Sequence, residues 1–253
     1  MDFPPDFQYS TLEGEPPLAY RQDGKGIAQP GLFFLPGFFS NMTGTKASFL
    51  AEKAALSGRM LTRLDYRGHG FSQGRFDEGC ISDWLEDALA IFDKVTEGPQ
   101  ILVGSSMGGW IMLLLALARP KRVAGLVGLA AAPDFTEDLV WKNLPPARQK
   151  EMLQKGVIYE TSEYDDSSVP YTLKLIEDGR KHMLLNKPIP VNCPVRLIQG
   201  MEDKDVPWGW ALRIAEKLQS PDVRVTLLKN SDHRLSAPAD LELIWQQIEG
   251  LCV

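Results

Sequence analysis

The strongest constraint on the fold of this chain is an alternation of short apolar runs with longer helical patterns. Each run is a continuous stretch of aliphatic and β-branched residues, which suits a parallel strand that is covered on both faces. Strands and helices that alternate in this way predict the α/β class, with a mostly parallel, doubly wound sheet and right-handed crossovers. The predicted strands are residues 31–37, 61–66, 100–104, 123–131, 195–200 and 223–228. The predicted helices are residues 82–95, 106–119, 208–218 and 238–251.

Two regions depart from this alternation. The first ~28 residues predict one or two antiparallel edge strands around a turn at Asp23-Gly24. Residues 134–190 lie between two predicted strands, are rich in Pro, Glu and Asp, and carry helical patterns at 147–155 and 171–185. A connection of this length inside a compact domain is usually functional. We therefore expect a core of residues 1–133 and 191–253 and a small helical cap of residues 134–190 over the functional site, with a purely structural insertion as the alternative.

Composition and charge exclude several classes of protein. The 253 residues suit one domain, and 33 acidic against 27 basic residues with no basic run argue against a nucleic-acid partner. The longest apolar stretch, residues 110–118, is too short to span a bilayer, and the N-terminus resembles neither a secretory signal nor a transit peptide. Cys80, Cys193 and Cys252 are widely spaced and match no metal-binding or thiol-catalysis pattern. We expect reduced thiols and a cytoplasmic location.

One predicted strand-to-helix junction carries the motif Gly104-Ser105-Ser106-Met107-Gly108, which fits the pattern Gly-x-Ser-x-Gly. The pattern is common by chance, but a strand before it and a helix after it make it specific. The glycines allow the chain to reverse sharply, so that the serine hydroxyl projects above the carboxyl edge of the sheet. The N-terminus of the following helix then lies where a developing oxyanion is stabilised. We expect Ser106 to be a nucleophile, and Ser105, which is out of register, to pack or support it.

A serine hydroxyl needs a base that removes its proton, and the chain offers three histidines. His69 precedes the motif in a glycine-rich loop, and His182 falls in the expected cap beside basic residues. His233 follows the last predicted strand, and it leaves room for an acid between the nucleophile and the histidine. We expect His233 to be the base, with a loop histidine of structural role as the alternative.

Three acidic residues are candidates for the acid that orients His233, because Glu202, Asp203 and Asp205 all follow the predicted strand at 195–200. Asp203 lies three residues after Gly200, at the usual place, whereas Asp205 could instead cap the next helix. We favour Asp203, keep Asp205 open and rank Glu202 a distant third. The acid would hold the histidine in one tautomer and stabilise its imidazolium form.

An oxyanion hole needs two backbone N–H groups. Met107, directly after the nucleophile, is expected to supply one of them. The other is expected from Phe38 in the segment Leu35-Pro36-Gly37-Phe38, where Gly37 lets the backbone approach closely. An ordinary turn at the end of a strand is the alternative.

Aromatic and basic residues near these motifs are candidates for substrate binding. Phe39, Trp110 and Trp208, together with Phe38 and Met107, could form an apolar wall for an acyl or aryl group. Plain core packing is at least as good an interpretation of the two tryptophans. Arg180, with its neighbours Lys181 and His182, could meet an anionic end of a substrate, and a solvated helix face is the alternative.

Five segments in order resemble the α/β-hydrolase superfamily over nearly the whole chain. They are residues 35–38, 65–72, 104–109, 200–207 and 231–233. Within it, residues 40–46, 104–110 and 200–208 are similar to the family of α/β-hydrolase domain-containing protein 10, whose mitochondrial enzyme is described as an acyl-glucuronide esterase and protein S-depalmitoylase. The resemblance implies the α/β-hydrolase fold and supports Ser106, Asp203 and His233 as a triad. Because a mitochondrial presequence is missing, the chain looks like a bacterial relative, and the physiological substrate is not carried over.

These residues together predict a serine hydrolase that acts by two-step acyl transfer on a small or medium-sized ester or thioester. The mechanism requires no metal and no organic cofactor. We expect a small-molecule substrate as the partner, and a monomer or a homodimer. Two alternatives stay open: an acyltransferase that uses the same triad, and a non-catalytic relative that only binds ligands.

Overall fold

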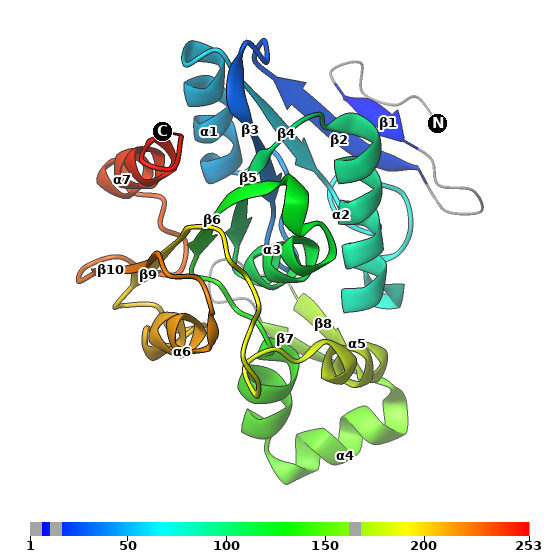
Figure 1. Cartoon of the computed structure of the whole chain (residues 1–253). Helices are drawn as coiled ribbons and strands as arrows, with labels where there is room; N and C mark the ends of the chain where they lie inside the picture. Colours follow the sequence, from blue (N-terminus) through cyan, green and yellow to red (C-terminus); the bar gives the residue numbers. More distant parts are fainter. Residues whose placement is uncertain (1–6, 11–16, 162–167, 253) are drawn as a thin grey trace.

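A mostly parallel sheet forms the centre of the protein. The computed structural model describes residues 7–10, 17–161 and 168–252. The strands of the sheet are β1 (Gln8–Ser10), β2 (Leu18–Asp23), β3 (Ala28–Leu35), β4 (Arg59–Leu64), β5 (Gln100–Ser105), β6 (Val123–Leu129), β9 (Val195–Gly200) and β10 (Val223–Leu228). Their spatial order is β1-β2-β4-β3-β5-β6-β9-β10, and all neighbours from β4 to β10 are parallel (Figure 1). This confirms the mostly parallel α/β sheet expected from the strand and helix pattern and the α/β-hydrolase fold that the family resemblance implies.

The N-terminal strands form the antiparallel edge of the sheet. β1 pairs with β2, and β2 pairs with β4, both in the antiparallel sense. The turn after Asp23 is present, and Gly24 takes a φ of 101°, which favours glycine. The expected edge strands are thus confirmed, but β2 and β3, which this turn joins, do not pair with each other because β4 lies between them.

Helices cover both faces of the sheet (Figure 1). On one face, α1 (Thr45–Leu56) and α7 (Pro238–Glu249) bury their apolar side chains together with those of the strands. On the other face, α2 (Ile81–Val95), α3 (Met107–Ala118) and α6 (Gly209–Lys217) enclose the second half of the core. The short helical turns η1 (Phe76–Glu78) and η2 (Pro120–Arg122) complete this part of the chain. Within the described residues, no helix has both the length and the hydropathy that a membrane span requires.

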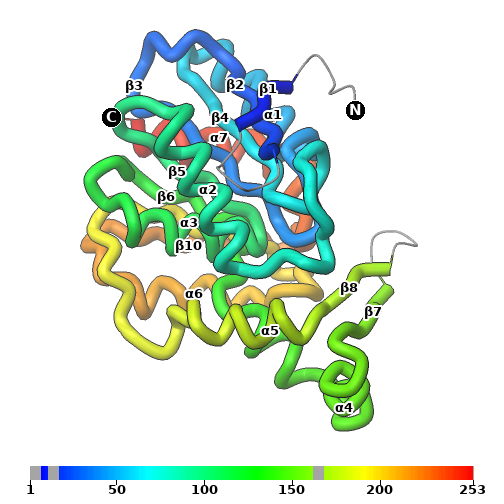
Figure 2. The backbone as a smooth tube through the Cα atoms, turned by 90° about the vertical axis from the view of Figure 1, so that its right-hand side faces the viewer, coloured from blue at the N-terminus to red at the C-terminus, as the bar shows by residue number. Residues whose placement is uncertain are grey.

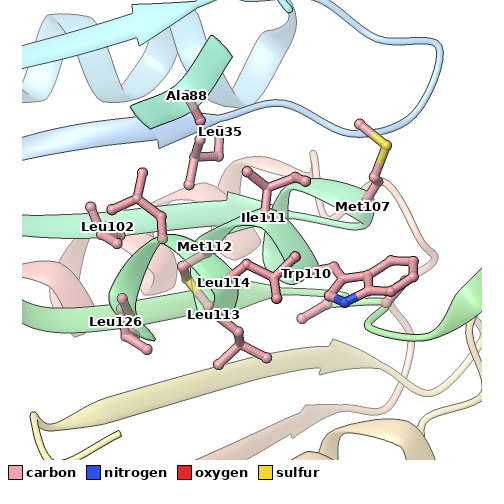
Figure 3. Packing of buried hydrophobic residues seen from close by; sticks show 14 of the residues in the cluster. Leu35, Ala88, Leu102, Met107, Trp110, Ile111, Met112, Leu113, Leu114 and Leu126 are labelled. Atoms are coloured by element: carbon pink, nitrogen blue, oxygen red, sulfur yellow. The ribbon is translucent and has the colours of Figure 1, made fainter. Parts of the chain in front are cut away.

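Helix α3 is the buried centre of the fold. Its side chains from Met107 to Ala116 are buried, as the uniformly apolar sequence predicts. Figure 3 shows Leu102 of β5, Leu126 of β6 and Leu35 of β3 gathered around this helix. Burial on all sides fixes the helix against the sheet, so its N-terminus has a defined position at the carboxyl edge of the strands.

The insertion between β6 and β9 contains the helices expected of a small helical cap and, in addition, a hairpin that was not expected. Its helix α4 (Pro146–Lys155) matches the predicted pattern, whereas α5 (Leu173–Gly179) covers only the first part of the second pattern. Between them, β7 (Val157–Thr161) and β8 (Ser168–Thr172) pair as an antiparallel ribbon. The remaining turns are η3 (Thr136–Val140), η4 (Trp141–Asn143) and η5 (Arg180–His182). In Figure 2, α4 and the hairpin extend away from the core.

A buried carboxylate joins the two ends of this insertion. Asp134 lies at its beginning, is buried, and has a φ of 63°. Its two oxygens accept hydrogen bonds from the backbone N–H groups of Leu184 and Leu185, each at 2.8 Å, where the insertion returns to the core. The insertion is therefore anchored at its base. Its treatment as a separate domain stays a prediction.

Candidate active site

Ser106 occupies a strained turn between β5 and α3. Its backbone angles are φ 54° and ψ −120°, a conformation that a residue with a side chain rarely adopts. Two hydrogen bonds hold the turn against the end of β6 and the residues that follow it. The Ser106 N–H donates to the Leu129 carbonyl at 2.9 Å, and the Ala132 N–H donates to the Ser106 carbonyl at 3.0 Å. The strain is thus maintained by the surrounding sheet, and it places the side chain at the mouth of a pocket.

The two motif glycines are required by close backbone contacts on either side of Ser106. A Cβ atom at Gly104 would lie 2.4 Å from the Gly108 carbonyl oxygen. A Cβ atom at Gly108 would lie 2.1 Å from the carbonyl oxygen of Leu35, at the end of β3. The structure therefore supplies the steric reason that the motif predicts, because α3 could not approach the sheet with larger residues at these positions.

His233 and Asp203 form a hydrogen-bonded pair beside this turn. His233 Nδ1 lies 2.8 Å from Asp203 Oδ2. The side chain of Asp203 is fully buried, and its other oxygen, Oδ1, accepts from the backbone N–H groups of Asp205 at 2.9 Å and Val206 at 2.8 Å. The carboxylate is thus held from two sides, and the proton of the imidazole is fixed on Nδ1, which leaves Nε2 free to accept.

Asp205, the alternative acid, is exposed and contributes its backbone N–H to the same carboxylate. The side chains of Asp203, Asp205 and His233 each bring a possible metal-ligand atom within 4.8 Å of the others. Because protein donors already fill both oxygens of Asp203, the donor set fits a hydrogen-bonded acid–histidine pair better than a metal centre. Glu202 is exposed as well, and its backbone N–H donates to Ser231 at 3.0 Å.

Close packing sets the distance between the loops that carry Asp203 and His233. A Cβ atom at Gly200, the last residue of β9, would lie 2.2 Å from the carbonyl oxygen of Ser231. The backbone of Met201 donates to Leu228, at the end of β10, at 2.8 Å. The two loops can therefore approach closely only because a glycine stands at this point.

A pocket of about 610 Å³ brings five of the predicted residues together. Ser106, Met107, Phe38, Phe39 and His233 all line it. Among the described residues, no direct hydrogen bond joins Ser106 to His233, a contact that often tightens only when a substrate binds.

The loop that carries Phe38 passes directly beside the nucleophile position. A Cβ atom at Gly37 would lie 3.3 Å from Ser106 Cβ and 3.3 Å from the carbonyl oxygen of Ser105. A buried carboxylate holds the continuation of this loop, because Asp65 accepts from the N–H of Met42 at 2.7 Å. Burial raises the pKa of Asp65 to about 6. This approach is compatible with a backbone donor at Phe38, although the oxyanion hole itself stays a prediction.

Aromatic residues from the core and from the insertion share one wall of the pocket. The ring of Phe38 stacks on Tyr171 of β8 at 5.2 Å between centroids and tilts against Phe135 at 5.6 Å. Phe39 packs against Phe76 at 4.9 Å. Tyr171 and Phe135 could not be predicted from the sequence, because they lie in the insertion, far from every motif, and only the folding of the insertion brings them to the pocket.

Three residues predicted to bind substrate lie elsewhere. Trp110 is fully buried in the core beside Met107 and Ile111 (Figure 3), and its indole N–H donates to the His182 carbonyl at 3.1 Å. Trp208 and Arg180 do not line the pocket either. The side chain of Trp208 is 42% exposed, and the Arg180 guanidinium donates to Glu137 at 2.7 Å and stacks on Trp141.

Basic side chains that the sequence did not single out line the pocket instead. They are Lys46, Lys204 and Arg234. The Lys46 ammonium donates to the carbonyl of Arg234, directly after His233. Burial, with a contribution from the Arg234 charge, lowers the pKa of Lys46 to about 8. The sequence does contain a pattern that predicts the helix carrying Lys46, because its buried residues follow a helical spacing: Ala47, Leu50, Ala51 and Ala54. This helix, α1, brings Lys46 to the pocket.

The sheet topology and the serine turn define the class of a serine hydrolase with the α/β-hydrolase fold. Comparisons with known proteins agree. Residues 29–166 match the family model described as serine aminopeptidase, S33. The rat palmitoyl-protein thioesterase ABHD10, mitochondrial, is 44% identical over 240 residues, which cover 93% of this chain and 79% of the rat protein.

Two solved structures are similar over nearly their whole length. Mouse α/β-hydrolase domain-containing protein 10 has a TM-score of 0.89 at 41% identity and 97% coverage of both chains. A putative hydrolase from Agrobacterium vitis has a TM-score of 0.92 at 38% identity, with coverage of 98% of this chain and 99% of that one. This chain therefore belongs to the serine aminopeptidase S33 family of α/β-hydrolases and, within it, to the family of ABHD10.

Proposed function

We propose that the protein hydrolyses carboxylic esters or thioesters through Ser106, His233 and Asp203 and an acyl-enzyme intermediate. The observation that carries the proposal is the pair of His233 Nδ1 and Asp203 Oδ2, 2.8 Å apart, whose histidine lines the same pocket as Ser106 in its strained turn. A neutral imidazole with its proton fixed on Nδ1 offers Nε2 as a base, which is what a serine nucleophile requires.

In the proposed reaction, Ser106 Oγ attacks the carbonyl carbon while His233 Nε2 takes its proton. The negative charge of the tetrahedral intermediate rests on the backbone N–H groups of Met107 and Phe38. His233 then protonates the leaving alcohol or thiol, and the acyl group stays on Ser106. A water molecule, deprotonated by His233, releases the acid by the reverse sequence and regenerates the enzyme.

One wall of the pocket suits an apolar acyl group. Phe38, Phe39, Phe135 and Tyr171 form this aromatic wall, and the pocket volume of about 610 Å³ lies in the range of small-molecule sites. The thioesterase activity in the name of the rat relative supports thioesters as a substrate class. The cytoplasmic location and the monomer or homodimer stay predictions.

A panel of esters and thioesters of graded acyl length tests the proposal. We expect Ser106→Ala to lower kcat by about 10⁴-fold or more while the protein stays folded, because loss of the nucleophile removes the whole covalent route. Ser105→Ala, which removes the neighbouring hydroxyl, is the matched control and should keep most of the activity. Retention of more than a few per cent of wild-type activity in Ser106→Ala would contradict the proposal.

The same panel separates the two alternatives. Added alcohol or amine acceptors that capture most of the acyl group in preference to water would identify an acyltransferase. Binding of the esters without turnover, in wild-type protein and in Ser106→Ala alike, would identify a ligand-binding relative.

A further inference from the structure

Gln199 is a buried amide directly behind the proposed acid. It stands near the end of β9 and is 1% exposed. Its Nε2 donates to Asp203 Oδ2 at 2.7 Å and to the Val206 carbonyl at 3.1 Å. One amide group thus spans the start and the end of the turn that carries Asp203.

The Asp203 oxygen that Gln199 contacts is the one that faces His233. Oδ2 accepts from Gln199 Nε2 at 2.7 Å and from His233 Nδ1 at 2.8 Å. Because backbone donors occupy Oδ1, both oxygens of the carboxylate have two partners each. Four donors restrain the carboxylate to one rotamer, and loss of the Gln199 donor weakens that restraint while His233 and the two backbone N–H groups remain.

The carbonyl oxygen of the Gln199 amide shows that this orientation of the side chain lowers the stability of the fold. Gln199 Oε1 is buried and has no hydrogen-bond partner among the described residues. An amide turned by 180° would place Oε1 against the Asp203 carboxylate and the Val206 carbonyl, both acceptors, so that orientation is excluded. A buried carbonyl without a hydrogen bond destabilises the folded protein, so stability does not explain this arrangement. A functional role of the amide Nε2 does explain it.

We propose that Gln199 is a positioning residue, whose amide holds the Asp203 carboxylate in the rotamer that receives His233 Nδ1–H and shares the same oxygen. This inference rests on the proposed function of the triad. Because a hydrogen bond from Gln199 withdraws charge from Oδ2, it also limits how strongly Asp203 stabilises the protonated imidazole. The other charged groups near the pair are Lys46, Asp205, Asp232 and Arg234, and all of them are retained when Gln199 is replaced.

Gln199→Met tests the proposal because it keeps the length of the side chain and removes the donor. We expect kcat to fall about tenfold, as is typical when a supporting hydrogen bond of a site residue is lost, while KM stays within about twofold. We also expect the acid limb of the pH profile of kcat/KM to move to higher pH, because Asp203 without the amide holds the imidazolium proton more tightly.

Gln100→Met is the matched control. Gln100 is also a buried glutamine of the sheet, 4% exposed, and its Nε2 donates to the Glu97 carbonyl at 2.7 Å, at the start of β5. It should lose a comparable amount of thermal stability and keep the wild-type kcat and pH profile. An equal fall in kcat in both variants, or a wild-type kcat and acid limb in Gln199→Met, would overturn the inference.

Gln199→Glu keeps the test decisive if the methionine variant does not fold. Two carboxyl groups at this distance share a proton, so the new acid can donate one hydrogen bond to Asp203. We expect a kcat between those of wild type and Gln199→Met, and a value below that of Gln199→Met would contradict the proposal. Ser106→Ala in the same assay shows separately whether the proposed triad operates: if wild-type activity does not depend on Ser106, the proposed function has failed, whatever Gln199 does.

Discussion

At the scale of single residues, His69 shows how burial sets charge next to the pocket. Its ring packs against Phe76 and Trp84, with centroids 4.8 and 5.1 Å away, and its Nδ1 contacts the Arg67 carbonyl at 3.3 Å. Burial lowers the pKa of His69 to about 4. Between about pH 6.5 and 4, the imidazole of His69 is therefore mostly neutral in the folded protein and mostly protonated in the unfolded chain.

This shift predicts a loss of stability in mild acid. Between about pH 6.5 and 4 the unfolded chain binds a proton at His69 that the folded protein does not, so the free energy of unfolding falls as the pH falls through this window. The loss attributable to His69 is up to about 3 kcal/mol. Urea unfolding of wild type and His69→Asn from pH 4 to 7.5 measures it, because asparagine keeps a donor near the position of Nδ1 and does not titrate.

Asp65 and Asp87 act in the opposite direction, since burial raises the pKa of each to about 6 and the folded protein then binds the extra proton. Both residues are present in wild type and in His69→Asn, so their effect cancels in the difference. A pH-independent difference between the two proteins would show that His69 is not the group that titrates.

Chemical identity and chain order led to Ser106, Asp203 and His233 as candidates, and the structure pairs His233 with Asp203 and places Ser106 and His233 in the lining of one pocket. The chain has only three histidines, and the distance from Gly200 favours one acid of three while leaving Asp205 open. The residues that line the pocket were less predictable, because the direction of a side chain is decided by packing that leaves no local signal. Trp110 and Arg180 have suitable chemistry but satisfied partners elsewhere.

At the scale of elements, the junction of β3, β5 and α3 depends on a backbone contact that admits no side chain. We expect Gly108→Ala to lower the free energy of unfolding by about 3 kcal/mol, because its Cβ would lie 2.1 Å from the Leu35 carbonyl oxygen and a main-chain shift is needed. Chemical denaturation measures the change, and activity should fall with it because Ser106 is displaced.

Gly209, the first residue of α6, is the matched control for this substitution. A Cβ atom there would meet no atom within 4 Å, so Gly209→Ala should leave stability unchanged or raise it by up to about 1 kcal/mol. Similar destabilisation by both substitutions would mean that the steric contact at Gly108 is not what matters.

Elements with strong periodicity were predictable from the sequence, and those with short or mixed patterns were not. β9 and β10 have the predicted bounds. The hairpin of β7 and β8 was missed because its strands have five residues each, one of them with a proline, and polar residues surround them. Helix α1 buries mainly alanines, so its apolar stripe is weak in the sequence although its spacing is helical.

At the scale of the whole molecule, the site is assembled from parts that are distant in the sequence. The core provides Ser106 and the pair of Asp203 and His233, while the insertion adds Phe135 and Tyr171 to the pocket wall. Asp134 ties the beginning of the insertion to its end, so the wall has a fixed base. The sequence indicates the candidate nucleophile, base and acid, because motifs mark strand ends, but it does not indicate the basic residues that line the pocket, and of the insertion it gives only the existence and part of the helical content.

Covalent labelling of Ser106 tests the central claim most directly. A fluorophosphonate reacts with a serine that a histidine base activates, and intact mass followed by peptide mapping locates the adduct. We expect one adduct per wild-type chain, on Ser106, with labelling abolished in Ser106→Ala and slowed strongly in His233→Ala. An adduct on another residue of the wild-type chain, or the absence of labelling in folded protein, would contradict the account.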